Sequence, residues 1–236
     1  MITGIIVITG IIMIIEPRAF LHLLTWLSPA FPTGAFAYSH GLEWAVAAGD
    51  VGDGESLRAW LATLLGDGSG RNDAILLRAA HRASAAPARL DEIAALGAAL
   101  APAAERRAET LAQGAAFAKA AVPWGGPWGG LWGGGSVAAP LPIVLGVLAA
   151  RHGIGEEVAV IGYLHAFAAN LISAGVRLIP LGQSAGLVVL AALEADILAI
   201  AAESRGQDLD DLGAACFRAD IAAMRHETQY TRLFRS

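Results

Sequence analysis

The chain has 236 residues, of which 56% are hydrophobic and 16% charged, and its formal net charge is −5. This balance argues against nucleic acid as the main partner, because phosphate binding needs clustered Lys and Arg. A lone cysteine, Cys216, excludes an internal disulfide framework and a thiolate metal site within one chain, and it fits a reducing cytoplasm. So apolar a chain is expected to leave hydrophobic surface uncovered as a monomer, as subunits of complexes often do.

Residues 1–17 form an apolar N-terminal extension, in which Ile5 to Ile15 are apolar except for Thr9 and Gly10. The stretch is shorter than the roughly 20 residues that span a bilayer, and it lacks the features of a signal peptide. We therefore expect a cytoplasmic protein without stable membrane insertion; membrane anchoring through this extension is a further hypothesis. Its β-branched residues favour a strand, although the rest of the chain offers no obvious sheet to receive one.

From Phe20 onward the hydrophobic periodicity is helical, which predicts an all-α fold. We expect residues 18–226 to form a single helical-bundle-like domain of about ten helices. Between Ser56 and Leu65 the apolar side chains recur at helical spacing, at Leu57, Trp60, Leu61, Leu64 and Leu65. The predicted helices are 20–27, 36–48, 56–65, 73–85, 89–100, 103–121, 140–152, 156–176, 184–204 and 208–226.

A low-complexity segment, PWGGPWGGLWGGG, runs from Pro123 to Gly135. So many glycines oppose a stable helix, which predicts a loop over residues 123–135. Trp124, Trp128 and Trp132 recur at every fourth position and could form a stacking platform. We favour a surface loop. Glycine allows many backbone conformations, so regular spacing of the tryptophans does not place them on one face.

Four polar residues crowd into six positions: Tyr38, Ser39, His40 and Glu43. The predicted helix 36–48 would place His40 and Glu43 on one face. One interpretation is a small-molecule or metal-dependent enzyme centred on these residues. However, Ser39 lacks the GxSxG elbow of hydrolases, so we expect no catalytic residue among them. The other histidines lack the spacing of a metal site, at His22, His81, His152, His165 and His226.

The last residues form the sequence HETQYTRLFRS, from His226 to Ser236. Tyr230, Leu233 and Phe234 are spaced to share one helical face, with Arg232 and Arg235 beside it. Free chain ends are rarely so apolar, which predicts a partner-docking tail over residues 227–236. The alternative is that these residues pack into the core of their own chain.

Three separated blocks resemble the urease accessory protein UreF family: SPAFPTGAFAYSHGLEWA (28–45), RLIPLGQSAG (177–186) and the tail HETQYTRLFRS (226–236). We call these segments, in this order, the first block, the second block and the tail. The first block matches the family pattern at Pro29, Pro32, Gly34, Tyr38, Ser39, His40, Gly41 and Glu43. In the second block Arg177 is expected to end a helix, Pro180 and Gly182 to form a turn, and Gln183 to begin the next helix.

The resemblance implies a non-enzymatic helical accessory protein of urease maturation that forms a homodimer. By the same resemblance it would bridge UreD (also called UreH) and the GTPase UreG, and would control GTP-dependent delivery of nickel to apo-urease. Nickel would be handled by the complex, so no metal ligands or cofactors are assigned to this chain. The residues expected to contact partners are Tyr38, Ser39, His40, Glu43, Arg177, Gln183, Tyr230, Arg232, Leu233, Phe234 and Arg235.

Overall fold

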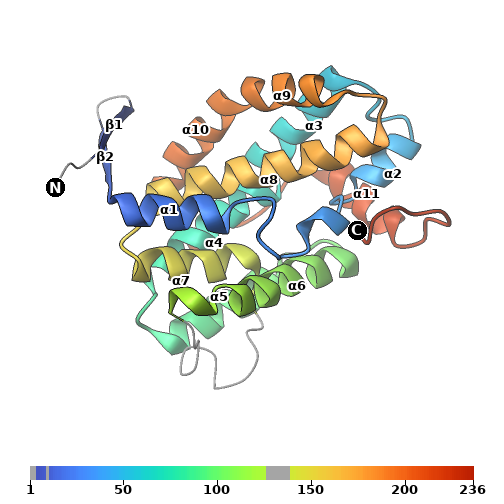
Figure 1. The fold of residues 1–236 in the computed structure, drawn as a ribbon. Helices are drawn as coiled ribbons and strands as arrows, with labels where there is room; N and C mark the ends of the chain where they lie inside the picture. The colour runs from blue at the N-terminus through green and yellow to red at the C-terminus, as the bar shows by residue number, and fades with distance from the viewer. Residues whose placement is uncertain (1–3, 9–10, 126–138) are drawn as a thin grey trace.

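The computed structural model describes residues 4–8, 11–125 and 139–236. The prediction of an all-α fold is confirmed, with eleven α-helices in the described residues (Figure 1). They are α1 (Pro17–Trp26), α2 (Leu42–Ala47), α3 (Gly54–Gly66), α4 (Ser69–Arg82), α5 (Pro87–Ala99), α6 (Ala104–Ala120), α7 (Leu141–Arg151), α8 (Glu156–Leu178), α9 (Gln183–Ala192), α10 (Glu194–Glu203) and α11 (Phe217–His226). Single 3-10 turns are η1 (Ala35–Ala37), η2 (Val122–Trp124), η3 (Ser204–Gly206) and η4 (Leu209–Asp211).

The N-terminal extension forms a two-stranded antiparallel hairpin of β1 (Gly4–Ile8) and β2 (Ile11–Ile15). The expected strand is therefore present, and its partner is the neighbouring segment of the same extension. In Figure 1 the hairpin projects from the helical body beside the start of α1. Ile15, paired with Gly4, is the point at which the hairpin joins the hydrophobic core.

The longest helix, α8, runs through the middle of the molecule (Figure 1). On one side it packs against α9, α10 and α3, and on the other against α4 and α7. Helix α7 is buried along almost its whole length, from Pro142 to Ala149. The face predicted between Ser56 and Leu65 is confirmed, because Leu57, Leu61, Leu64 and Leu65 are all buried.

A buried arginine joins α4 to the ends of α8 and α10. Arg78 is 1% exposed, and its guanidinium contacts Glu156 at 3.1 Å and Glu157 at 2.5 Å. It also donates to the Ser204 hydroxyl at 3.0 Å and to the Ala201 carbonyl at 2.6 Å. A buried guanidinium is tolerated only with such a full set of acceptors, so this network fixes the relative positions of three helices.

Two predicted helices towards the C-terminal end of the chain differ from the structure. The segment 184–204 divides at Leu193, where a turn separates α9 from α10. In 208–226 only Phe217–His226 is α-helical, because the preceding backbone forms tertiary bonds. There the Gly213 amide donates to the Asn72 side chain at 3.0 Å, and the Ala215 amide donates to the Asp67 carbonyl at 2.9 Å.

Apolar side chains remain on the surface of several helices, as the composition predicts. They are Phe20, Leu21 and Leu24 on α1, Leu187 and Val188 on α9, and Phe217, Ile221 and Met224 on α11. Two helical stretches, Glu156–Leu178 and Gln183–Gly206, are long and apolar enough to cross a membrane by length and composition alone. Half of the first window is buried inside the fold, as expected for a core helix, and the second is interrupted at Leu193.

The predicted Gly/Trp loop lies mostly outside the described residues. Trp124 belongs to η2, and Gly125 follows it with a positive φ of 111°. Trp128 and Trp132 fall in the segment 126–138, which the structure does not describe. The prediction of a loop there stays a prediction.

Candidate functional site

The first block is irregular up to Gly41, apart from the 3-10 turn η1, and its last residues form the start of α2. Three of its residues have left-handed backbone, Gly34 (φ 77°), His40 (φ 61°) and Gly41 (φ 78°). The predicted helix 36–48 is therefore wrong before Leu42, and His40 does not share a helical face with Glu43. Gly41 is required here for a second reason, because a Cβ would lie 2.7 Å from the backbone nitrogen of Ala223 on α11.

The first block, the second block and the tail meet at one end of the molecule. The guanidinium of Arg177, in the last turn of α8, lies 3.7 Å from the ring centroid of Phe36 and 4.3 Å from that of Phe234. Each ring contributes a cation–π contact to the same charge. In Figure 1 the C-terminal segment lies beside α2 and α11, at the end of α8. Segments that lie far apart in the sequence thus form one junction, which we call the three-block junction.

Glu43 anchors the tail from the first turn of α2. Its Oε1 accepts the Leu233 amide at 2.6 Å, and its Oε2 accepts the Phe234 amide at 3.0 Å. The same Oε2 lies 3.0 Å from Nε2 of His226, which is fully buried at the end of α11. A carboxylate that is 5% exposed needs several donors, and here the tail backbone supplies two of them.

The end of the tail is held by Ser39 and Glu109. The Ser39 amide donates to the Ser236 carbonyl at 2.7 Å, and the Ser39 hydroxyl donates to the same oxygen. The Ser236 hydroxyl in turn donates to Glu109 on α6, and the Arg235 amide donates to the Ala37 carbonyl at 2.9 Å. The tail is thus hydrogen-bonded to its own chain along several residues.

Glu109 lies in a buried charged group with Arg106 and His40. Burial alone would raise the pKa of Glu109, but the neighbouring Arg106 and His40 lower it to about 2. The pKa of His40 is lowered to about 4, first by burial and then by Arg106, against the opposing influence of Glu109. Near neutral pH the group therefore holds an ionised Glu109 and a neutral His40.

The tail is not helical after His226, so the expected helical face of Tyr230, Leu233 and Phe234 is wrong. Turns and bends follow α11, because Glu43 and Ser39 take up the backbone groups that a helix would bond internally. Phe234 is 4% exposed, whereas Tyr230 is 102% and Leu233 76% exposed. The tail thus divides into a buried anchor and outward-pointing apolar side chains.

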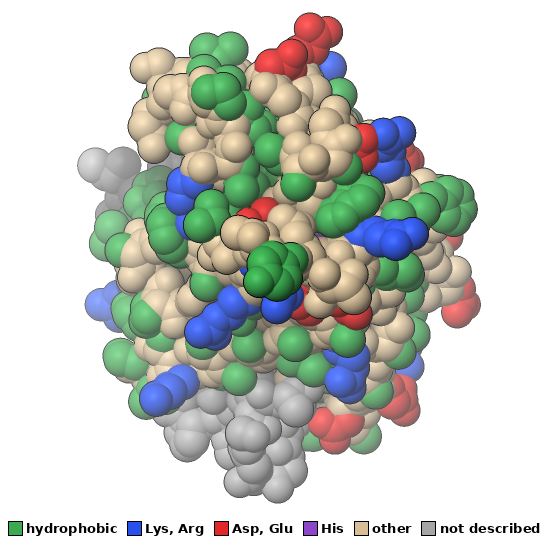
Figure 2. All heavy atoms as spheres, turned by 90° about the vertical axis from the view of Figure 1, so that its right-hand side faces the viewer, with side chains coloured by type: hydrophobic (Ala, Val, Ile, Leu, Met, Phe, Trp, Pro, Cys, Tyr) green, Lys and Arg blue, Asp and Glu red, His purple; other side chains and the backbone are tan. Residues whose placement is uncertain are grey.

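The remaining predicted contact residues are exposed or half-buried. Arg232 is exposed and pairs with Glu105 on α6 at 2.5 Å, and Arg235 is also exposed. Gln183 is exposed at the first position of α9, and Tyr38 is half-buried in the first block. Figure 2 shows the face that carries this end of the molecule, where hydrophobic and basic side chains are interspersed. Such a mixed surface is typical of protein interfaces.

The structure separates the side chains of the hypothetical catalytic group. Nε2 of His40 lies 2.7 Å from the Ser69 hydroxyl, and its Nδ1 lies 3.5 Å from Glu109. The Ser39 hydroxyl donates to the tail, and Glu43 accepts from the tail. A nucleophile, base and orienting acid must contact one another in sequence, and these three residues each have a different partner.

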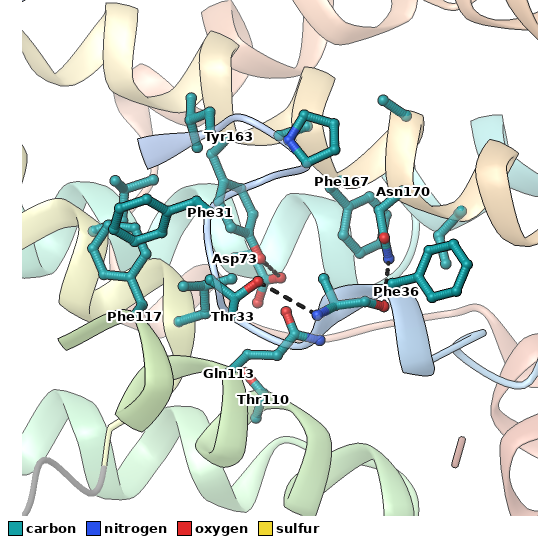
Figure 3. A pocket seen from close by; sticks show the side chains of 18 of the residues that line it. Phe31, Thr33, Phe36, Asp73, Thr110, Gln113, Phe117, Tyr163, Phe167 and Asn170 are labelled. Atoms are coloured by element: carbon teal, nitrogen blue, oxygen red, sulfur yellow. Dashed lines mark hydrogen bonds between the residues drawn. The ribbon is translucent and has the colours of Figure 1, made fainter. Parts of the chain in front are cut away.

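A cavity of about 290 Å³ lies beneath the first block, and sequence reasoning did not find it. In Figure 3 Asp73 of α4 and Tyr163 of α8 lie in the lining of this cavity, between Phe31 on one side and Phe36 on the other, both from the first block. The Tyr163 hydroxyl donates to Asp73 at 2.5 Å. Burial raises the pKa of Asp73 to about 6, although this hydrogen bond opposes the shift. No spacing in the sequence links these residues, which are ninety positions apart.

Sequence reasoning also missed the acidic residues of α6 that receive the tail, Glu105 and Glu109. The periodicity predicts their helix at 103–121 but not which residues of the chain end would reach it. Within the described residues, no three His, Cys, Asp or Glu side chains are grouped to hold a metal ion. The absence of metal ligands in the whole chain stays a prediction.

Comparison with known proteins identifies the family. The UreF family model matches residues 51–194, which include the second block. A urease accessory protein UreF from Bradyrhizobium sp. (strain BTAi1) is 53% identical over 225 residues, covering 94% of each chain. One from Rhizobium leguminosarum bv. trifolii is 51% identical over 221 residues, covering 94% of this chain and 98% of the relative. One from Rhodopseudomonas palustris (strain BisB5) is 50% identical over 219 residues, covering 91% and 90%.

The family match and the alignments with relatives over nearly the full chain indicate the same family. They also agree with the resemblance of the three blocks. The chain belongs to the UreF family of urease accessory proteins.

Proposed function

We propose that this chain bridges a UreD/UreH-like accessory protein and a UreG-like GTPase in the complex that delivers nickel to apo-urease. In this role it regulates GTP-dependent assembly of the metal centre and performs no covalent chemistry itself. Nickel is the cargo of the complex, so this chain needs no resident metal. The proposed place of action is the cytoplasm, and the proposed functional form is a homodimer.

The observation that carries the proposal is the three-block junction. Arg177 brings Phe36 and Phe234 together, and Glu43 fixes the backbone of Leu233. The anchor is buried, yet Tyr230 and Leu233 point outward from it. A chain that serves only to fill its own core would bury these two side chains, whereas a docking surface presents them on a rigid support.

The proposed partner surface therefore consists of Tyr230, Leu233, Arg235, Phe36 and Gln183, all of which are exposed. Several other predicted contact residues support this surface: Ser39 and Glu43 bond to the tail, His40 lies beside Glu109, and Arg232 pairs with Glu105. Exposed aromatic and aliphatic side chains beside arginine are the residue types that dominate binding energy at interfaces.

The test is co-purification and calorimetry with a UreD/UreH-like protein. Tyr230→Ala and Leu233→Ala are each expected to weaken binding by about 1–3 kcal/mol, the range for an interface anchor. Their melting temperatures should match the unmodified protein, because both side chains are exposed.

Leu21→Ala is the matched control, since Leu21 is 62% exposed on α1, at the other end of the molecule. It removes the same type of side chain at similar exposure and should leave the affinity unchanged. Unaltered affinity in both tail variants would show that Tyr230 and Leu233 do not contribute to the interface. Equal losses in the tail variants and in Leu21→Ala would show that the affinity depends on general surface hydrophobicity.

A further inference from the structure

His226 is fully buried, and each of its two ring nitrogens faces a carboxylate oxygen. Nδ1 lies 2.6 Å from Glu105 on α6, and Nε2 lies 3.0 Å from Glu43 on α2. An ionised carboxylate only accepts hydrogen bonds, whereas a neutral imidazole has a single N–H to donate. Two hydrogen bonds to ionised carboxylates require two N–H donors, and a neutral ring supplies only one. The cluster must therefore hold one additional proton, on the ring or on a carboxylate.

The other partners of the two carboxylates decide where this proton lies. Glu43 accepts the amides of Leu233 and Phe234, and Glu105 accepts the guanidinium of Arg232. Donors directed at a carboxylate favour its ionised form. The additional proton therefore lies on the ring, which makes His226 an imidazolium.

With this assignment the charges of the cluster balance. Glu43 and Glu105 carry the two negative charges, and His226 and Arg232 carry the two positive ones. Loss of the ring proton would leave a net negative charge next to a side chain with 0% exposure. It would also direct a nitrogen lone pair at a carboxylate oxygen within about 3 Å, a repulsive contact.

Other charged groups lie on the same elements, but each has a different environment. On α6, Arg106 pairs with Glu109. Just after α11, Glu227 accepts the first two amides of α6 at 2.7 and 3.2 Å. On α11 itself Asp220 is partly buried and Arg225 is exposed, and in the tail Arg235 is exposed. The nearest charges to the ring are thus Glu43 and Glu105, which contact it directly.

We propose that docking of the tail is proton-linked, with the His226 imidazolium holding Glu43 in the position that receives the Leu233 and Phe234 amides. Rising pH removes the proton, displaces Glu43 and releases residues 232–236 from the body. This inference concerns the isolated chain and is independent of any partner. Its consequence for the proposed function is that the surface carrying Leu233 is presented only in the protonated state.

The first test is the protonation state of the unmodified, full-length protein. In long-range ¹H–¹⁵N correlation spectra of ¹⁵N-histidine-labelled protein, both His226 nitrogens should show imidazolium shifts at pH ~6.5. The resonance is assigned by its loss in His226→Gln. A neutral tautomer, with two widely separated nitrogen shifts, would overturn the proposal.

The second test is hydrogen exchange of the Leu233 and Phe234 amides between pH ~6.5 and ~9, corrected for intrinsic exchange. Release of one proton predicts a loss of protection of up to about tenfold per pH unit. Core amides of α7 should show no such loss. The exposed His165 on α8 supplies the control His165→Gln, which should behave as the unmodified protein. Protection of Leu233 and Phe234 that does not change with pH would contradict the proposal.

Discussion

The guanidinium of Arg177 lies 4.3 Å from the ring centroid of Phe234, which joins the end of α8 to the anchor of the tail. The same guanidinium lies 3.7 Å from the ring centroid of Phe36. The two rings differ in exposure, since Phe234 is buried and Phe36 is 66% exposed. Arg177 therefore links an inner, structural aromatic to an outer one that is available to a partner.

A double-mutant cycle with Arg177→Gln and Phe234→Leu is expected to give a coupling of about 0.5–1 kcal/mol in the free energy of unfolding, the usual range for a cation–π pair whose cation is exposed to solvent. Urea denaturation of the two single variants and the double variant measures it. Phe36→Leu provides the comparison: it should lower partner affinity while changing the free energy of unfolding little. Additive effects of Arg177→Gln and Phe234→Leu would mean that the contact contributes nothing.

Deletion of residues 233–236 is expected to destabilise the protein, because it leaves Glu43 and Glu109 without hydrogen-bond donors from the tail. Each buried carboxylate left short of donors costs about 1–3 kcal/mol. Denaturation should therefore show a clear loss for the deletion, whereas Tyr230→Ala, which removes only an exposed side chain, should show none. A truncated protein as stable as the full chain would mean that the tail is held too weakly to act as a fixed docking surface.

The carboxyl of Asp73 should make the protein less stable as the pH rises. Its pKa is raised from 3.8 to about 6, first by burial, so the folded state holds the proton more tightly than the unfolded chain. The corresponding stability is present below pH ~4 and is lost as the pH rises towards ~6. Asp73→Asn is therefore expected to exceed the unmodified protein in free energy of unfolding at pH 7, by up to about 3 kcal/mol.

The two proteins should converge near pH ~3.5, where both side chains are uncharged. His40 has the opposite dependence, because its lowered pKa makes stability rise with pH, but this contribution is common to both proteins and cancels in the difference. Asp91→Asn, at an exposed position of α5, is the control and should show no such gain. An Asp73→Asn variant less stable than the unmodified protein at pH 7 would contradict the burial argument.

The sequence predicts correctly which face of a helix is buried in the core. It predicts backbone conformation less well where hydrogen bonds to distant residues replace those within a helix. Leu57 and Leu61 recur at helical spacing and are buried, as expected. His40 is different, because its backbone is left-handed and the neighbouring Gly41 lies close to α11, an approach that no local pattern encodes. The tail shows the same limit: its spacing is helical, but Glu43 binds the amides of Leu233 and Phe234 from a distant helix.

The residues of the junction could be named from the three blocks, but their division of labour could not. Phe234 and Leu233 are adjacent apolar residues in the sequence, and only the structure shows that one is buried and the other exposed. Their roles depend on which side of the tail faces Arg177 and Glu43. Likewise, the local sequence places Glu105 and Glu109 on a helix but does not show that they bond to Arg232 and Ser236 of the tail.

His40 distinguishes a scaffold from an enzyme. Nε2 of His40 contacts Ser69, and its ring packs edge-on against Phe167 at a centroid distance of 5.1 Å, so its contacts are those of a packed core residue. In a reconstituted urease activation assay, His40→Gln is expected to lower activation at limiting concentration and to recover when the accessory protein is raised. Mass action restores a weakened complex, whereas loss of a general base usually costs about a hundredfold or more at any concentration. Circular dichroism first establishes that the variant is folded. Activation that stays abolished while complex formation is saturated would assign His40 a chemical role and overturn the scaffold interpretation.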